Sequence, residues 1–145
     1  MSRDITQLKP EVAEQLNDMV RTIGHFNIKQ GWRNKSSEIV NTLFGAGRED
    51  LVPVFQNYLA AAMIALIHSE LSEGLEGLRK GLMDDHLPHR KMVTAEMADV
   101  LIRVFDFADA FDLNLGDVVV EKDAYNHHRD DHKLENRAKE GGKKF

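Results

Sequence analysis

Apolar residues recur every three or four positions along most of this chain, which is the spacing of helices that bury one face. The spacing predicts a first helix over residues 10–24, because a proline at its first position is tolerated there. A short second helix is predicted to start at the serines at 36–37 and to end at the glycines at 45–47. Both segments carry one apolar stripe, which we expect to face a core.

Two longer helices are predicted to follow and to pack against each other. The first covers residues 51–80, and because residues 59–67 are apolar all round, we expect other helices to enclose its first half. The second covers residues 91–111 and has a broad apolar face. The intervening loop contains glycine, two aspartates and proline, so the chain is expected to reverse its direction there.

A last helix is predicted over residues 114–129. Asn114 is expected to cap this helix, with Asp117 three positions later, and Leu113 and Val118 are placed as a hydrophobic staple. Three consecutive valines in this segment would equally suit a strand. We favour the helix, because one isolated strand would leave its backbone hydrogen-bonding groups without partners.

Composition supports one all-α domain. The chain has 145 residues, 42% hydrophobic and 30% charged, enough for a single core. We expect a bundle of four to five helices over residues 1–132 and a charged, flexible tail over residues 133–145. The formal charge of −5 argues against binding of nucleic acid, which requires clustered lysine and arginine.

The sequence also bears on metal chemistry and on location. No cysteine is present, so disulfides and thiolate metal sites are excluded. The first residues lack the apolar run of a signal peptide, and the longest apolar stretch, 58–67, is about half of the ~20 residues that span a membrane. We therefore expect a cytoplasmic protein that does not insert into a membrane.

Two pairs of acidic residues are spaced so that each pair shares one helix face. Glu70 and Glu73 lie three positions apart on one predicted helix, and Glu96 and Asp99 lie three apart on the next. At ~1.5 Å rise per residue, Glu73 and Glu96 lie about 10 Å and 8 Å from the turn, so the pairs would face each other. Four carboxylates suit a hard cation, Mg²⁺ or Mn²⁺, which could bind a phosphate chain. Ordinary solvated helix acids are the alternative.

Two further side chains, Trp32 and Arg103, allow two interpretations each. Trp32, the only tryptophan, could stack on a nucleobase at the mouth of the bundle or pack in a core or interface. Arg103 follows Asp99 by four positions and could position the carboxylates, or form an exposed intrahelical ion pair worth only ~0.3–0.5 kcal/mol. Asp106 continues the acidic stripe. The histidines of the loop and of the last helix are expected at the surface.

Residues 65–129 resemble the MazG-like, all-α nucleoside triphosphate pyrophosphohydrolases. The family motif, E-E-x-x-E followed after a spacer by E-x-x-D, has its counterparts at residues 69–73 and 96–99, separated by 22 residues. Ser69 replaces the first glutamate of that motif. Residues 121–129 resemble the family segment E-K-x-x-Y-N-x-x-R, and the Gly-Gly-Lys-Lys-Phe ending is similar to that of phage-type members.

The resemblance implies a reaction and an assembly. Such an enzyme uses Mg²⁺ and a metal-activated water to cleave a nucleoside triphosphate into the monophosphate and pyrophosphate. It forms homodimers or homotetramers. The resemblance assigns the metal and the chemistry to Glu70, Glu73, Glu96 and Asp99. Nucleotide contacts are implied for a stripe of the last helix: Lys122, Asn126 and Arg129.

Two other functions stay open. Ser69 suggests a non-catalytic helical module that binds a nucleotide or a partner helix. A hydrolase of an alarmone or of a modified nucleotide would share the metal site and differ only in its pocket.

Overall fold

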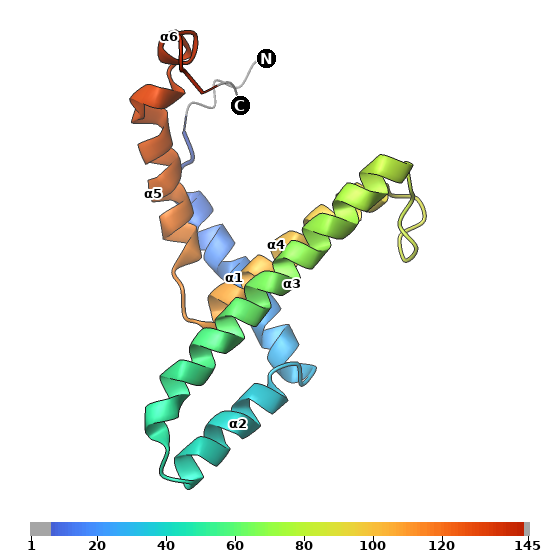
Figure 1. Ribbon diagram of the computed structural model, residues 1–145, viewed down its shortest axis with the longest axis vertical. Coiled ribbons are helices and arrows are strands. Elements are labelled where there is room, and N and C mark those ends of the chain that lie inside the picture. The colour runs from blue at the N-terminus through green and yellow to red at the C-terminus, as the bar shows by residue number, and fades with distance from the viewer. Residues whose placement is uncertain (1–6, 144–145) are drawn as a thin grey trace. The chain divides into compact units, whose positions relative to one another are not determined.

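The computed structural model describes residues 7–143, and within these the secondary structure is helical, apart from one isolated bridge between Met83 and Lys91 (Figure 1). This confirms the predicted all-α class. The elements in chain order are α1 (Glu11–Lys29), α2 (Asn34–Gly45), the 3₁₀-helix η1 (Glu49–Leu51), α3 (Val52–Lys80), α4 (Met92–Ala110), α5 (Leu115–His128), the 3₁₀-helix η2 (Asp130–His132) and α6 (Leu134–Arg137).

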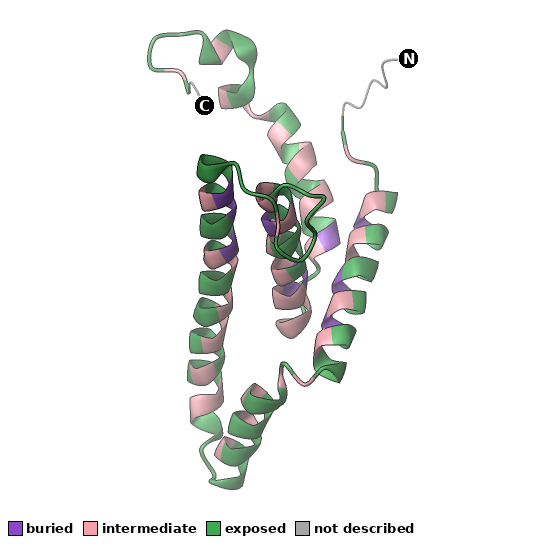
Figure 2. Ribbon diagram, turned by 90° about the vertical axis from the view of Figure 1, so that its right-hand side faces the viewer, coloured by how far each residue is buried: buried purple, intermediate pink, exposed green. Residues whose placement is uncertain are grey.

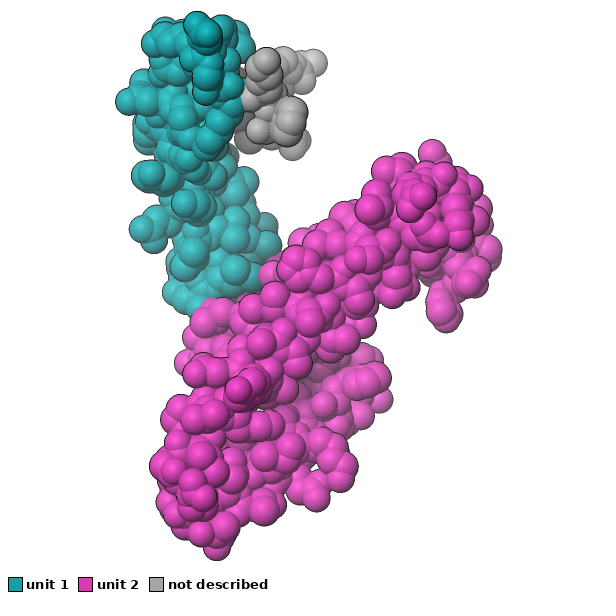
Figure 3. Space-filling view, viewed as in Figure 1, with its two compact units in different colours: residues 1–19, 114–145 teal, residues 20–113 magenta. Residues whose placement is uncertain are grey.

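The chain forms two compact units, which Figure 3 distinguishes by colour. One unit combines residues 1–19 with residues 114–145, as far as these are described. The other unit is continuous and comprises residues 20–113. Helix α1 therefore contributes its first half to one unit and its second half to the other.

Within residues 20–113, α3 and α4 lie side by side as an antiparallel hairpin (Figure 1). Helix α3 ends at Gly81, whose φ of 66° lies in the left-handed region that glycine adopts without strain. Two glycines of α3, Gly74 and Gly77, are buried and allow close approach of α4. The predicted chain reversal and the pairing of these two helices are thus present in the structure.

Helix α1 continues past the end that its sequence predicted. We expected it to stop at Gly24, but it runs to Lys29. Gly24 is a packing glycine, because a Cβ atom there would lie only 2.0 Å from the Cγ of Asp109 in α4. The left-handed residue that follows the helix is Gly31, with φ +82°.

The first half of α3 is not enclosed, which corrects our expectation. Figure 2 shows α3 exposed along much of its length, and its buried residues are Glu70, Gly74 and Gly77, all in the second half. Large apolar side chains such as Val54 and Tyr58 are exposed. The described helices of this chain cover only one face of α3, so a segment that is apolar all round keeps an apolar outer surface.

The same helix has the length and composition of a membrane span. Together η1 and α3 form a helical run from Glu49 to Lys80, with a mean hydropathy of 1.5 in its most apolar window, none of which is buried. Core helices of soluble proteins can meet the same criterion of length and composition.

In the unit formed by the chain's two ends, α5 packs against the first half of α1 through Asn17. The Asn17 side chain donates to Asn114 Oδ1 at 2.8 Å and accepts from the Gly116 backbone N–H at 2.8 Å. A Cβ atom at Gly116 would lie 2.1 Å from the Ala13 carbonyl oxygen. The predicted cap from Asn114 itself is wrong: Asn114 makes no side-chain cap, and Asn17 satisfies the start of α5 instead.

Candidate metal centre

The α3–α4 hairpin brings three of the four predicted acids together. One carboxylate oxygen each from Glu70, Glu96 and Asp99 lies within 4.8 Å of the other two. Glu73 lines the same cavity as these three residues. Glu70 and Glu96 are only 6% and 7% exposed, whereas Glu73 and Asp99 are exposed to solvent. The spacing predicted that the two acidic pairs would face each other across the hairpin, and Glu70 does face Glu96 and Asp99.

Gly74 allows the two acidic pairs to approach. A Cβ atom at this position would lie 3.3 Å from Glu96 Cβ and 3.0 Å from Met97 Cε. Glycine has no side chain, so α4 can lie close to α3 at the level of Glu70 and Glu73, which occupy the same stretch of helix. The close packing follows from one small residue directly after the predicted motif at residues 69–73.

Arg103 is an ion-pair partner of the cluster. Its guanidinium pairs with Glu70 Oε1 across the two helices, with Nε and Nη2 both directed at that oxygen. Arg103 therefore contacts one of the carboxylates that it was expected to position. The contact joins α4 to α3 and is not the intrahelical ion pair that we considered as the alternative. The arginine therefore holds Glu70 through Oε1.

The cluster carries more negative charge than Arg103 balances. Burial raises the pKa of Glu96 to about 7, and a hydrogen bond with Glu70 and the charges of Glu73, Glu70 and Asp99 act in the same direction. A bound cation would relieve this repulsion, and an all-oxygen donor set is the set that Mg²⁺ or Mn²⁺ prefers. The residues present therefore fit a hard divalent metal ion.

The acids lie in a cavity of about 1080 Å³, large enough for a small ligand. Its lining is apolar along α3, where Phe55, Leu59 and Met63 contribute. Trp32 also lines the cavity and is 79% exposed, so it is not a core residue. Asp84 and His86 of the loop between α3 and α4 contribute to the same lining, which the sequence did not indicate.

An ion-pair network next to Trp32 was also not predicted. Arg33 donates from Nη1 to Asp109 Oδ2 at 2.7 Å, and from Nη2 to Asp106 Oδ1 at 2.6 Å and to the Asp106 carbonyl oxygen at 3.0 Å. Its Nε is buried and has no hydrogen-bond partner within residues 7–143. Asp106 lines the same cavity as the acids, as its place on the acidic stripe predicted, and it also holds the loop between α1 and α2 onto α4. No local signal marks this network, because 73 to 76 residues separate its partners.

The three predicted nucleotide contacts of α5 belong to the other compact unit and form a cluster of their own. Lys122 Nζ lies 4.7 Å from the centroid of the Tyr125 ring, and Arg129 Cζ lies 5.8 Å from it. Tyr125 is 58% exposed rather than packed in a core. Asn126 Oδ1 is buried and has no hydrogen-bond partner among the described residues.

Comparisons with models of known protein families, with curated proteins and with solved structures found no match to this chain. The site therefore has to be interpreted from its own geometry. It offers buried and exposed carboxylates for a metal ion and a cavity with an exposed indole. A separate cluster of cations lies in the other compact unit, along α5 and at its end.

Proposed function

We propose that this protein is a Mg²⁺-dependent nucleoside triphosphate pyrophosphohydrolase that acts in the cytoplasm and converts a nucleoside triphosphate into the monophosphate and pyrophosphate. The observation that carries the proposal is the meeting of Glu70, Glu96 and Asp99 within 4.8 Å across the α3–α4 hairpin. The spacing of these acids, together with Glu73, is also the one that resembles MazG-like enzymes.

The four acids would hold the metal ion, either Mg²⁺ or Mn²⁺. Glu70 is held by Arg103, so one ligand is already oriented before a cation binds. Bound at these acids, the metal would lower the pKa of a water molecule, bridge phosphate oxygens and stabilise the charge that develops on the leaving pyrophosphate. Glu73 and Asp99 are exposed and can reach ions that a substrate brings with it.

The cavity next to the acids would hold the nucleoside. Its apolar wall along α3 and the exposed indole of Trp32 suit a flat, aromatic base. The resemblance assigns contacts with the phosphates or the sugar to Lys122, Asn126 and Arg129 of the other compact unit. Two of these residues are cations, and the Asn126 amide oxygen has no hydrogen-bond partner among the described residues.

We further propose that the protein assembles as a homodimer or homotetramer. The first half of α3 exposes apolar side chains that the described helices of the chain leave uncovered, including Val54, Tyr58 and Ile64. A second copy of the chain would bury this surface and supply the enclosure that the all-round apolar sequence of α3 predicts.

Incubation with a panel of ribo- and deoxyribonucleoside triphosphates and Mg²⁺ tests the proposal. Pyrophosphate and the monophosphate should accumulate in equal amounts, and Glu73→Gln or Asp99→Asn should abolish the reaction without loss of helical circular dichroism. Glu76→Gln is the matched control, since Glu76 lies one turn from Glu73 but pairs with Lys80 at 2.5 Å and does not line the cavity. Release of orthophosphate alone, or no turnover with any substrate, would refute the assignment.

A non-catalytic binding module is the second candidate, and the geometry of Ser69 favours it. The Ser69 hydroxyl donates to the Leu66 carbonyl oxygen at 2.7 Å, so its hydrogen is used within α3. Where the resembling family has the first glutamate of its motif, this chain thus has a hydroxyl engaged by its own helix. This candidate predicts saturable nucleotide binding with no turnover at any metal concentration. Turnover of an alarmone or of a modified nucleotide, but of no standard triphosphate, would instead identify the third class of function.

A further inference from the structure

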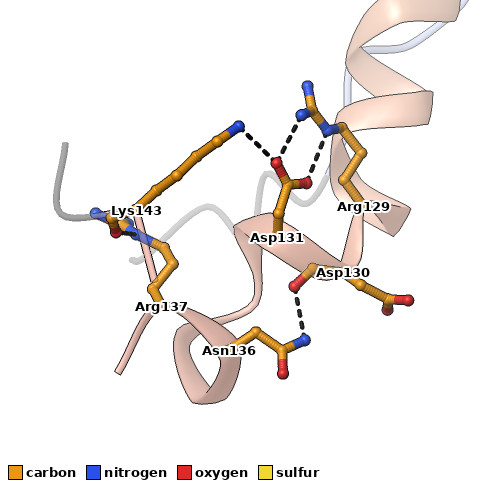
Figure 4. Close-up of polar contacts among 6 residues, drawn as sticks. All are labelled: Arg129, Asp130, Asp131, Asn136, Arg137 and Lys143. Carbon is orange, nitrogen blue, oxygen red and sulfur yellow. Dashed lines mark hydrogen bonds and ion pairs between the residues drawn. The ribbon is translucent and has the colours of Figure 1, made fainter. Parts of the chain in front are cut away.

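The chain folds back beside the C-terminal end of α5, where Arg129 pairs with Asp131 (Figure 4). Arg129 Nε donates to Asp131 Oδ1 at 2.9 Å, and Arg129 Nη2 donates to Asp131 Oδ2 at 2.7 Å. Two parallel hydrogen bonds fix both the position and the plane of a guanidinium, which one contact does not. Arg129 is therefore held in one orientation in the absence of any ligand.

A second cation from the end of the described chain binds the same carboxylate. Lys143 Nζ donates to Asp131 Oδ2 at 2.6 Å, as Figure 4 shows. Hydrogen bonds from Arg129 and then from Lys143 hold the pKa of Asp131 well below its usual range. The carboxylate is thus a fixed negative charge shared by two cations, and one Asp131 orients both.

Glycines make this return of the chain possible. Gly141 has φ +78°, and a Cβ atom at Gly142 would lie only 2.5 Å from the Arg137 carbonyl oxygen. Arg137 Nε in turn donates to the Lys143 carbonyl oxygen at 3.2 Å. The Gly-Gly-Lys sequence that we expected to lie in a flexible tail therefore forms a turn that presents Lys143 to Asp131.

A guanidinium has two edges that can each bind an oxyanion. Asp131 occupies the edge formed by Nε and Nη2, and these two atoms make the described hydrogen bonds of Arg129. The other edge, formed by Nη1 and the second hydrogen of Nη2, does not contact Asp131 and keeps its N–H donors for a further oxyanion. Arg129 and Lys122 both lie over the exposed ring of Tyr125, so two cations gather at this ring, and Lys143 joins Arg129 at Asp131.

We infer that Asp131 is a positioning residue for phosphate binding: with Lys143 it holds Arg129 so that the remaining guanidinium edge, together with Lys122, receives a phosphate group beside Tyr125. The inference deepens the proposed function, on which it rests in assigning that phosphate to a nucleoside triphosphate. A carboxylate that merely competed with phosphate would have the opposite effect, because its removal would free both edges of Arg129.

Inorganic tripolyphosphate in metal-free buffer is the probe, and NMR of the Arg129 Nε–H and the Tyr125 ring is the readout. Asp131→Asn should weaken tripolyphosphate binding about tenfold, even though the substitution removes a negative charge. Asp130→Asn is the matched control, since it removes the same charge one residue away, from a carboxylate that pairs with Lys133 instead. Binding by Asp131→Asn that equals or exceeds that of the unmodified protein would overturn the inference.

Two further measurements keep the result interpretable. In the unmodified protein without ligand, the Arg129 Nε–H should exchange with water more slowly than in free arginine, and equal rates would count against a held guanidinium even if the variant did not fold. The binding assay contains no metal and requires no turnover, so failure of the proposed reaction and failure of this inference are distinguishable. If turnover is found, Asp131→Asn should raise KM severalfold and change kcat less than twofold.

Discussion

Gly77 of α3 lies directly against Met92 of α4, and a Cβ atom at position 77 would come within 2.8 Å of both Cβ and Cγ of Met92. This contact lies one turn nearer the loop than the contact of Gly74 with Glu96. Together the two glycines set the separation of the helices, and hence the distance between the two pairs of carboxylates.

Gly77→Ala should destabilise the hairpin, because the methionine Cβ cannot move without a shift of the helix backbone. We expect a loss of about 1–3 kcal/mol in the free energy of unfolding, measured by urea denaturation, and weaker Mg²⁺ binding. Gly45→Ala is the control, since a Cβ atom there meets nothing within 4 Å. An unchanged stability of Gly77→Ala would mean that the helices are not in close contact at this level.

The metal-free protein should lose stability as pH rises through neutrality. The folded-state pKa of Glu96 is raised from 4.5 to about 7, so its contribution is fully present below about pH 4.5 and is lost as pH rises through 7. Glu96→Gln should therefore be more stable than the unmodified protein at pH 8, by about 1–3 kcal/mol, but not at pH 4.5.

Thermal unfolding at the two pH values, with and without Mg²⁺, measures this effect. Mg²⁺ should stabilise the unmodified protein at pH 8 and stabilise Glu96→Gln much less, because a neutral amide is a weaker ligand. A stability difference between the two proteins that does not vary with pH would exclude a raised pKa at Glu96.

Arg33→Met should destabilise the unit of residues 20–113. The substitution leaves Asp106 and Asp109, which are each about one-fifth exposed, without their cation, at a cost of about 1–3 kcal/mol in denaturant unfolding. Arg48→Met provides the comparison, because its pair with Asp50 is exposed to solvent and should contribute little to stability. Equal effects of the two substitutions would show that the Arg33 network has no special stabilising role.

Tyr58→Glu should dissociate the proposed assembly. The side chain is 74% exposed in the single chain and lies on the apolar half of α3, where a charge would be buried by a second copy. Sedimentation velocity should show a homodimer or homotetramer for the unmodified protein and a shift towards monomer for the variant. Leu134→Glu in α6, at a similarly exposed position, should leave assembly unchanged. A monomeric unmodified protein at 100 μM, roughly the upper range of such measurements, would contradict the proposal.

The order of the helices could be predicted from the sequence because each carries its own periodicity, and α3, α4 and α5 begin and end within two residues of the predicted bounds. The end of α1 was missed, since a glycine in a sequence can mark either a helix end or a close contact. Gly24 is the second kind, and only the position of Asp109 reveals it. The exposure of α3 was also missed. A helix that is apolar all round is expected to be enclosed, but the sequence does not indicate whether its own chain or another molecule encloses it.

The meeting of Glu70, Glu96 and Asp99 was predictable because spacing along two adjacent helices determines the level of each residue in a hairpin. Contacts made between distant parts of the chain were not. Arg33 reaches Asp106 and Asp109 across more than 70 residues, and Asn17 reaches Gly116 across 99. The sequence predicted only a flexible tail where the turn brings Lys143 to Asp131, because glycines allow many backbone conformations. The ion pair between Lys143 and Asp131 occurs in one of these conformations.

The unit that joins the first part of α1 to α5 has a consequence for biosynthesis. The hydrogen bonds from Asn17 to the start of α5 connect residues 97 and 99 positions apart, so a ribosome must add nearly the whole chain before this unit can close. The continuous unit of residues 20–113 can fold earlier, with the amino-terminal segment still waiting for its partner. During that interval the part of α1 that packs against α5 stays uncovered. Chaperone binding to the nascent chain should therefore decrease once α5 has emerged from the ribosome.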